Sequence, residues 1–349
     1  MNEIGSEFAY DSSIFQTKNY AWEKHFPKKS MVFLSSGRDS IIYFIRAYKI
    51  KKILLPSYVE ELILKLFQSE NVQVKFYKIN DELKIDLDEL KKKSHDVDAV
   101  FLIHYFGFVH TPTEIKIFCQ ENNLILIEDC VQSMLSTFQD KPIGSFSDVS
   151  LNSLRKFIGI PDGSILTTKK RTNIFESNLH KKFVNKKKSA LIGKFNYLSG
   201  NKNYSRYYFK NAFVDAEKII YQYKKPAPMT MESRNMLKKI NFEKISKTRR
   251  KNFRHLLSHL TNIAFYKKLP NNVCPLGFPI ICKNRSKTKK NLIKNKIYPA
   301  IHWELSNEIK KNEFDESWKI SKSILTIPID QRYSMEDMER IVSVLRKID

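Results

Sequence analysis

Glycine, cysteine and long apolar runs are scarce in this chain, and the last two scarcities each exclude a class of protein. Glycine makes up 9 of 349 residues and cysteine 4. The spacing of the cysteines suits neither a zinc site nor a small disulfide scaffold, so we expect reduced thiols in a cytoplasmic protein. No apolar run approaches the roughly 20 residues that span a bilayer, and the N-terminus lacks the basic and apolar regions of a signal peptide.

Acidic residues are also outnumbered, which gives a formal net charge of +24. The excess is concentrated in lysine runs at 181–182, 186–188 and 283–296. Such runs attract anionic substrates, anionic membrane surfaces or nucleic acid, but for any one run a solvated basic face is the simpler interpretation. The chain shows no zinc-finger spacing, RNP-like aromatic motif or helix-turn-helix, so we expect neither nucleic-acid binding nor a metal site.

The apolar pattern of the N-terminal half alternates between strands and helices. We expect strands at 53–55, 72–79, 99–104 and 124–127, and helices at 39–47, 60–69, 87–93 and 113–121. This alternation predicts an α/β fold with a mostly parallel sheet covered by helices on both faces. Ligands of such sheets bind at the carboxyl ends of the strands, which is where Asp129 falls.

The C-terminal half has a different character. Residues 171–228 are rich in basic and aromatic side chains, a composition that suits nucleic-acid or membrane binding, but a helical insertion whose aromatics pack on the body is favoured. A long helix from 236 to 260 is expected next, followed by strands at 278–282, 300–303 and 324–327 and a closing helix at 335–348. We therefore divide the chain into a large domain, 1–235, and a smaller α+β domain, 236–349.

Lys156 and Asp129 are the most informative pair of residues in the chain. Asp129 ends the apolar strand at 124–127, and Lys156 lies in a turn before a glycine-containing segment. A surface lysine and a strand-end acid would explain each residue taken alone. Six segments that include this pair occur in a defined order: FLSSGRDS at 33–40, ILLPSY at 53–58, FLIHYFG at 101–107, IEDCVQS at 127–133, IGSFSD at 143–148, and Lys156 followed by Asp162–Gly163.

In this order and spacing, the six segments resemble the DegT/StrS group of sugar-nucleotide aminotransferases, which have pyridoxal phosphate (PLP) fold type I. The resemblance implies that Lys156 binds PLP covalently and that Asp129 keeps the pyridine nitrogen protonated, so that the ring acts as an electron sink. It also implies that the turn at Ser36, Gly37 and Arg38 holds the cofactor phosphate at a helix N-terminus. Arg38 departs from the family pattern and either contacts the phosphate or points to solvent.

Further cofactor contacts follow from the same resemblance. Gln132 is expected to touch the cofactor, with a helix-start cap as the alternative. Ser153 is expected to offer its hydroxyl to the phosphate, although the segment before Lys156 is shorter than in the family. Tyr58 is expected to stack on the ring, with Val59 or Glu60 as alternatives at that position.

Two histidines and the oligomeric state complete the interpretation. His104 is expected to be structural, and His302 to lie near the substrate mouth. The family resemblance implies a homodimer in which a residue ahead of the long helix reaches the partner's cofactor. The usual asparagine is missing here, and Ser233 or Asn235 could substitute.

The resulting hypothesis is a cytoplasmic PLP-dependent aminotransferase. It would convert a keto-sugar on a nucleotide diphosphate to an amino-sugar for surface polysaccharide or lipopolysaccharide, with glutamate as amino donor. One alternative is a PLP-dependent sugar dehydratase, although such family members tend to replace the lysine that Lys156 retains. The other is a basic binding or scaffold protein that kept the fold and lost the activity.

Overall fold

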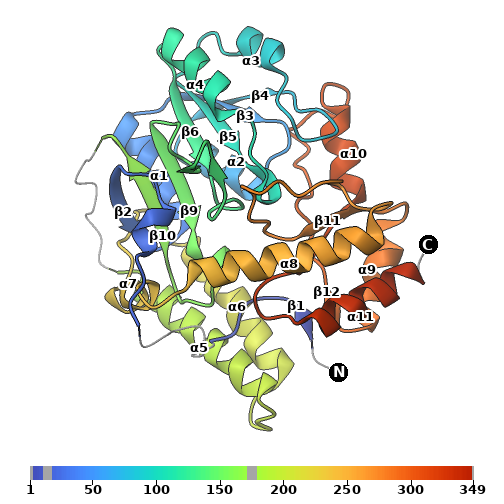
Figure 1. Ribbon diagram of the computed structural model, residues 1–349. Helices are drawn as coiled ribbons and strands as arrows, with labels where there is room; N and C mark the ends of the chain where they lie inside the picture. Colours follow the sequence, from blue (N-terminus) through green and yellow to red (C-terminus); the bar gives the residue numbers. More distant parts are fainter. Residues whose placement is uncertain (1–2, 11–17, 171–178, 348–349) are drawn as a thin grey trace.

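A seven-stranded sheet forms the centre of the computed structural model, which describes residues 3–10, 18–170 and 179–347 (Figure 1). The strand order is β2-β10-β9-β6-β5-β3-β4, and only the two pairs that involve β10 are antiparallel. The mostly parallel α/β architecture predicted from the sequence is therefore confirmed. The strands are β2 (Ser30–Leu34), β3 (Lys52–Pro56), β4 (Gln73–Tyr77), β5 (Ala99–Ile103), β6 (Ile125–Asp129), β9 (Val149–Ser153) and β10 (Ser164–Thr168).

The central strands are buried because helices cover the sheet. All five residues of β5 are buried, and its sequence AVFLI is a continuous apolar run of the kind found in parallel sheets. The covering helices of the N-terminal half are α1 (Gly37–Tyr48), α2 (Glu61–Ser69), α3 (Leu87–Lys93) and α4 (Pro112–Glu121). Each lies within two residues of its predicted bounds. Sequence analysis did not anticipate β2, β9 and β10.

Asp129 and Lys156 lie at one edge because of the strand register. Asp129, the last residue of β6, pairs with Ile103 in β5 and with Leu151 in β9. The chain leaves β9 through the short 3₁₀ helix η4 (Leu154–Lys156). The other short elements are η2 (Trp22–His25), η3 (Tyr105–Gly107), β7 (Thr137–Phe138) and β8 (Lys141–Pro142).

The predicted insertion contains a helical hairpin of α5 (Lys181–Leu198) and α6 (Arg206–Ile220), drawn in yellow-green below the sheet in Figure 1. Residues 171–178 of the insertion lie outside the described residues. Phe209 and Phe213 are buried between the two helices, as expected for aromatics that pack inward. Tyr207 and Tyr208, in contrast, are 76% and 48% exposed, so only part of the aromatic set packs on the body.

The long helix predicted at 236–260 is two helices, α7 (Met231–Leu237) and α8 (Phe242–Leu260). Asn241 separates them: its side-chain carbonyl accepts a hydrogen bond from Lys244 N and thereby starts α8 as an N-cap. Apolar spacing continues across the break, which explains why the pattern predicted one helix.

The C-terminal part combines short strands with three further helices. It contains β11 (Phe278–Ile281), α9 (Arg285–Lys294), β12 (Ile297–Tyr298), α10 (Asp315–Ser323), β13 (Ile324–Ile327) and α11 (Met335–Arg346). β11 pairs antiparallel with β13, and the N-terminal β1 (Ile4–Gly5) pairs parallel with β12. The strand predicted at 300–303 is wrong: Ala300 forms an isolated bridge with Thr326, while Trp303 N donates to the Tyr58 hydroxyl.

Two expectations about the whole chain concern membrane-spanning helices and the division into domains. Among the helices formed by described residues, none is both long and apolar enough to cross a membrane. The division into domains 1–235 and 236–349 stays a prediction.

Candidate active site

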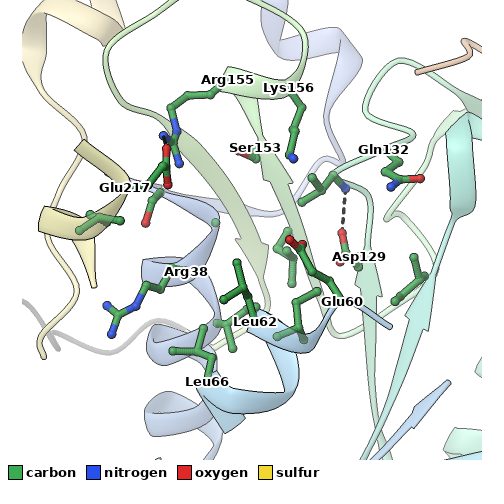
Figure 2. Close-up of a pocket in the computed structure, with 18 of the residues that line it drawn as sticks. Arg38, Glu60, Leu62, Leu66, Asp129, Gln132, Ser153, Arg155, Lys156 and Glu217 are labelled. Atoms are coloured by element: carbon green, nitrogen blue, oxygen red, sulfur yellow. Dashed lines mark hydrogen bonds and ion pairs between the residues drawn. The ribbon is translucent and has the colours of Figure 1, made fainter. Parts of the chain in front are cut away.

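A cavity of about 190 Å³ opens at the carboxyl edge of the sheet, where Asp129 and Lys156 both line it (Figure 2). The start of α1, the end of β6, the η4 turn and the last part of α6 surround this cavity. Strand-end loops, a helix N-terminus and the hairpin thus meet at one place. This is the edge at which parallel α/β sheets bind ligands.

Asp129 is the buried acid of the cavity. Its side chain is 5% exposed, and Oδ1 accepts a hydrogen bond of 2.9 Å from Val131 N. Burial raises the pKa of the Asp129 carboxyl to about 7; the negative charge of Glu60 adds to this, while the hydrogen bond and the charge on Lys156 oppose it. A cationic group in the cavity would therefore favour the ionised form of Asp129.

Lys156 lines the same cavity from the turn that follows the neighbouring strand β9. It is the last residue of η4, and Figure 2 shows its side chain pointing into the same cavity that Ser153, Asp129 and Gln132 line. Because β6 and β9 are parallel neighbours, their carboxyl ends lie side by side. The pairing of β6 with β9 thus brings Asp129 and Lys156 to the same edge, although they are 27 positions apart in the sequence.

Two glycine-dependent contacts bring the Lys156 turn and the α1 turn together. Leu154 N donates to Gly163 O at 3.1 Å, and Gly163 N donates to Ser35 O at 2.7 Å. Gly163 has φ +141°, and an added Cβ would lie within 3.1 Å of three neighbouring side chains. Only glycine fits this link without strain, which explains the glycine in the segment after Lys156.

The α1 turn offers backbone donors to the cavity. Ser36 is the N-cap of α1: its Oγ accepts from Asp39 N at 3.2 Å. At Gly37, an added Cβ would lie 3.7 Å from the Ser153 Cβ, so the predicted phosphate residues Ser36, Gly37 and Ser153 lie together. A helix N-terminus with an adjacent hydroxyl suits a dianionic phosphate.

Asp39 is an acid beneath the same turn, and sequence analysis did not weigh it as a site residue. It is fully buried, receives the Ser36 hydroxyl at 2.7 Å, and lies with Oδ2 3.7 Å from His180 Nδ1. Burial raises the pKa of Asp39 to about 7, although the bonds from Ser36 and the charges on Arg38 and Arg155 oppose the shift. A protonated Asp39 is compatible with an anion at the turn; an ionised one would repel it.

Arg38 lines the cavity but directs its guanidinium outward, as Figure 2 shows. The guanidinium lies 5.7 Å from the centre of the Tyr221 ring on the hairpin side. Of the two alternatives predicted for Arg38, this orientation favours a place at the cavity rim over a deep phosphate contact.

Gln132 lines the cavity, and its side-chain amide already makes one hydrogen bond within the protein. Its Oε1 accepts a hydrogen bond of 2.6 Å from Phe106 N. This bond fixes the side chain and leaves the NH₂ group as the donor for a ligand.

Tyr58 lies behind the wall of the cavity, which argues against the predicted stacking role. It is fully buried, and its hydroxyl accepts from Trp303 N at 2.8 Å and donates to His302 O. Glu60, one of the two alternatives, lines the cavity instead, together with Trp303. The hydrogen bonds of the Tyr58 hydroxyl require neighbours 244 and 245 residues away in the chain, which no local pattern indicates.

The hairpin supplies residues that sequence analysis missed. Glu217 of α6 accepts hydrogen bonds from Arg155 Nη1 at 3.0 Å and from Lys187 Nζ at 2.9 Å. Burial raises the pKa of the Glu217 carboxyl, but the charges on Arg155 and Lys187 outweigh it and lower the pKa to about 2. This ion cluster connects both hairpin helices to the residue that precedes Lys156.

A second cavity of about 710 Å³ lies on the other side of Lys156. Its walls come from the N-terminal segment, from α6 and from the C-terminal part. The basic side chains among its lining are Arg155, Lys156, Lys210, Lys218, Arg249 and Arg332. Acidic Glu7, Glu217 and Asp330 also contribute, so the surface is basic on balance.

The two predicted histidines lie in different surroundings. His104 is buried between Glu128, whose Oε1 lies 3.0 Å from Nε2, and His110 N, which donates to Nδ1 at 3.2 Å. These contacts favour a structural role. His302 lines the larger cavity, and burial together with the charge on Lys156 lowers its pKa to about 3, so the ring is neutral.

The two candidates for a contact to a partner subunit differ in their exposure to solvent. Ser233 is fully buried, and its hydroxyl donates to Asp162 Oδ1. Asn235 is exposed on α7. The geometry therefore favours Asn235 of the two.

A strand-end lysine beside a strand-end acid, at the edge of a mostly parallel seven-stranded sheet, is the arrangement of fold-type-I PLP enzymes. Residues 27–176, which carry both side chains, match the model of the DegT/DnrJ/EryC1/StrS aminotransferase family. The family resemblance read from the sequence is thereby confirmed over this part of the chain.

Curated relatives match shorter segments. A GDP-perosamine synthase from Escherichia coli O157:H7 is 26% identical over 104 residues, which are 29% of this chain and 28% of that protein. A second GDP-perosamine synthase, from Vibrio cholerae, is 30% identical over 71 residues, 20% of this chain and 19% of the relative. A GDP-4-keto-6-deoxy-D-mannose 3-dehydratase from E. coli O55:H7 is 28% identical over 153 residues, 39% of each protein. The aligned segments thus span less than half of these relatives.

Solved structures extend the likeness of fold to nearly the whole chain. The sugar aminotransferase Spr1654 from Streptococcus pneumoniae, in its PLP form, has a TM-score of 0.69 at 12% identity and covers 100% of both chains. The aminotransferase TlmJ from Streptoalloteichus hindustanus has a TM-score of 0.67 at 14% identity, covering 94% of this chain and 88% of that one. At such identities the comparison shows the fold.

Proposed function

We propose that this protein is a PLP-dependent aminotransferase that converts a keto-sugar on a nucleoside diphosphate to an amino-sugar. The observation that carries the proposal is the meeting of Lys156 and buried Asp129 in one cavity at neighbouring strand ends. The match of residues 27–176 to the model of an aminotransferase family supports the same reaction class.

The donor set of the cavity fits the cofactor. Lys156 Nζ would hold it covalently, and Asp129 would pair with its ring nitrogen. The backbone N–H groups after Ser36 and the Ser153 hydroxyl would hold its phosphate, because a helix N-terminus stabilises an anion. Bound there, pyridoxal phosphate would supply an electron sink for the negative charge that develops when a C–H bond next to nitrogen is broken.

Each protein group then has a defined task. Asp129 would hold a proton on the ring nitrogen, and its bond from Val131 N keeps the carboxylate in place. Lys156 Nζ would carry the proton removed from the amino donor. The Arg155–Glu217 ion pair would orient the turn that carries Lys156.

The larger cavity is the proposed site of the nucleotide-linked sugar. Its basic lining, with Lys210 and Lys218 on α6, suits a diphosphate. The relatives are named for GDP-linked sugars, so we propose the same substrate class here, with glutamate as amino donor. The reaction would take place in the cytoplasm. Its product would serve the synthesis of surface polysaccharide or lipopolysaccharide.

We further propose a homodimer of two-domain subunits, divided near residue 235. A two-fold dimer is the commonest soluble assembly, and exposed Asn235 is the candidate for a contact to the partner's cofactor. Light scattering should give twice the chain mass of 41.2 kDa. A monomer that still binds PLP would contradict the shared site.

The decisive experiment is reconstitution with PLP followed by borohydride reduction. We expect a yellow protein and, after reduction and proteolysis, a cofactor adduct on the peptide that contains Lys156. Incubation with GDP-4-keto-6-deoxy-D-mannose and glutamate should then give an amino-sugar product in mass spectrometry. An adduct on another lysine, or none, would refute the assignment of the site.

Two other functions make different predictions in this experiment. A sugar dehydratase, favoured by the 153-residue match to such an enzyme, would bind PLP and give a deoxygenated product in place of an amino-sugar. A scaffold protein that lost its activity would bind no cofactor. The acids Glu60 in the cavity and Asp39 beneath the turn are the features that favour it.

A further inference from the structure

Three metal-ligating side chains meet on the surface where α8 packs on α11. His255 and His259 come from α8 and Glu339 from α11, and their ligand atoms all lie within 4.8 Å of one another. Figure 1 shows the two helices side by side. The cluster is separate from the residues that line both cavities around Lys156.

The helix geometry holds the two imidazoles together. Residues four apart lie on the same face of a helix, and the two ring centres are 4.6 Å apart. The backbones are fixed by the core, because Leu256 on α8 and Met338 on α11, each next to a ligand, are fully buried. The three ligands are therefore presented by rigid elements, as a metal site requires.

His259 already has the outer contact that orients a metal-binding histidine. Its Nδ1 lies 2.9 Å from His255 O. A carbonyl oxygen only accepts, so Nδ1–H is the donor and the lone pair is on Nε2. Metal-ligating histidines typically donate their second ring N–H to a carbonyl or carboxylate in this way.

His255 and Glu339 are close to the separation that a shared ion imposes. His255 Nε2 lies 2.9 Å from Glu339 Oε1. Two ligands of tetrahedral Zn²⁺ with bonds of about 2.0 Å are roughly 3.3 Å apart, so a movement of a few tenths of an ångström suffices. The Glu339 side chain is 59% exposed, which allows this movement and gives the ion access from solvent.

We propose that His255, His259 and Glu339 bind one Zn²⁺ ion, with water as the fourth ligand, and that the ion joins α8 to α11. Two imidazoles and one carboxylate suit Zn²⁺ and related transition metals, whereas Mg²⁺ and Ca²⁺ prefer oxygen ligands. The surrounding charge does not favour cations: the net charge is +24, and Arg346 Nη2 lies 3.5 Å from His259 O. Selection therefore rests on ligand chemistry.

The sequence does not predict this metal site, because the spacing of its cysteines does not suit zinc and the three ligands are not grouped in the chain. The His-x₃-His pair is separated from Glu339 by 80 positions in the chain, and only the packing of α11 on α8 brings the third ligand to the pair. A single helical histidine pair without a third ligand carries little information.

Zn²⁺ titration of tag-free, metal-free protein tests the site, with displacement of Zn²⁺ from a chromophoric indicator as the readout. We expect one Zn²⁺ per chain and a rise of several degrees in the unfolding midpoint at saturation, because a ligand that binds only the folded state stabilises it. Mg²⁺ and Ca²⁺ should have no effect. Absence of saturable binding, or binding without a rise in the midpoint, would overturn the proposal.

Single-residue variants locate the ion. His259→Gln and Glu339→Gln should each weaken Zn²⁺ binding at least roughly tenfold and abolish the thermal shift. Glu339→Gln is nearly isosteric and exposed, so it tests the site without risk to the fold. The matched control is His95→Gln, which changes an exposed histidine outside the cluster and should bind like the parent. Equal affinity in all variants would show that Zn²⁺ binds elsewhere.

Discussion

The strand-end side and the hairpin side of the cavity around Lys156 are built by different means. On the strand-end side, Asp129 and Lys156 are placed by backbone hydrogen bonds and the register of β6 and β9. On the hairpin side, Glu217 of α6 and Tyr221, which directly follows this helix, are placed by side-chain contacts to Arg155 and Arg38. Backbone register tolerates sequence change far better than individual side-chain pairs do.

This difference separates the chemistry from the selectivity. The family match covers residues 27–176 and therefore the strand-end side, whereas the hairpin begins after it. We infer that the strand-end side carries the reaction and that the hairpin side adapts the site to its substrate. Variants on the two sides should accordingly fail in different ways.

The largest effect is expected for Lys156→Ala on the strand-end side. Loss of the covalent anchor and of the proton carrier should reduce transamination by roughly 10⁴-fold, the upper range for a positioned acid–base group. The PLP-loaded variant should also lose the borohydride adduct. Lys169→Ala is the control, since Lys169 is an exposed lysine paired with Asp148. Retention of activity in Lys156→Ala would remove the strand-end side from the reaction.

Asp129→Asn should slow each half-reaction by roughly 10²–10³-fold, because an amide cannot keep the ring nitrogen protonated. The PLP-free variant should nevertheless be more stable than the parent. Burial raises the pKa of Asp129 to about 7 from its usual value of 3.8, so the parent loses stability as the pH rises from 3.8 to 7. Asparagine removes this loss.

Denaturant unfolding of the PLP-free proteins at pH 4 and pH 8 measures the stability effect. The gain of Asp129→Asn over the parent should grow by about 1–4 kcal/mol between the two values. Asp88→Asn, at an exposed position in α3, should change neither the rate nor the stability. A parent protein whose stability is flat over this range would contradict the buried, protonated Asp129.

Glu217→Gln tests the ion cluster of the hairpin side. The variant should lose about 1 kcal/mol at neutral pH, a modest value because 43% of the Glu217 side chain is exposed and solvent screens its charge. The pKa of Glu217 in the folded protein, about 2, lies below the usual glutamate value of 4.5. The contribution is therefore complete above pH 4.5 and is lost as the pH falls towards 2.

Acid unfolding of the parent and Glu217→Gln shows this difference. The stability gap between the two proteins should close between pH 4.5 and pH 2. In activity assays KM for the sugar nucleotide should rise more than kcat falls, since the hairpin faces the larger cavity. A fall in kcat alone would place Glu217 with the strand-end side.

The smallest effect is expected for Lys210→Ala and Lys218→Ala at the rim of the larger cavity. Both lysines are exposed, so each should change KM only a few-fold at low salt. The difference should disappear at high salt, where the attraction to an anionic substrate is screened. Lys202→Ala, an exposed lysine between α5 and α6, is the control. A salt-independent effect would indicate a direct contact and not a general field.

Local sequence signals indicated β6 and its terminal acid but not β9, the strand that leads to Lys156. Apolar runs with strand and helix periodicity indicated β3, β5 and β6 and the helices between them, and the order of motifs singled out Lys156 and Asp129. Prediction was weaker wherever a residue's role depends on a distant partner. Tyr58 is turned into the core by Trp303 and His302, and the apolar pattern near 240 concealed the break capped by Asn241.

Local patterns in the sequence are enough to indicate β3, β4, β5 and β6, the helices between them and the acid that ends β6, because period-two and period-3.6 patterns depend only on near neighbours. The three-dimensional packing places β9 beside β6 and thereby Lys156 beside Asp129. It also sets which ring or acid faces the cavity, how Glu217 reaches Arg155, and how Glu339 joins two histidines that lie 80 and 84 positions away. Those outcomes depend on side-chain packing between segments far apart in the chain, and no local pattern contains that information.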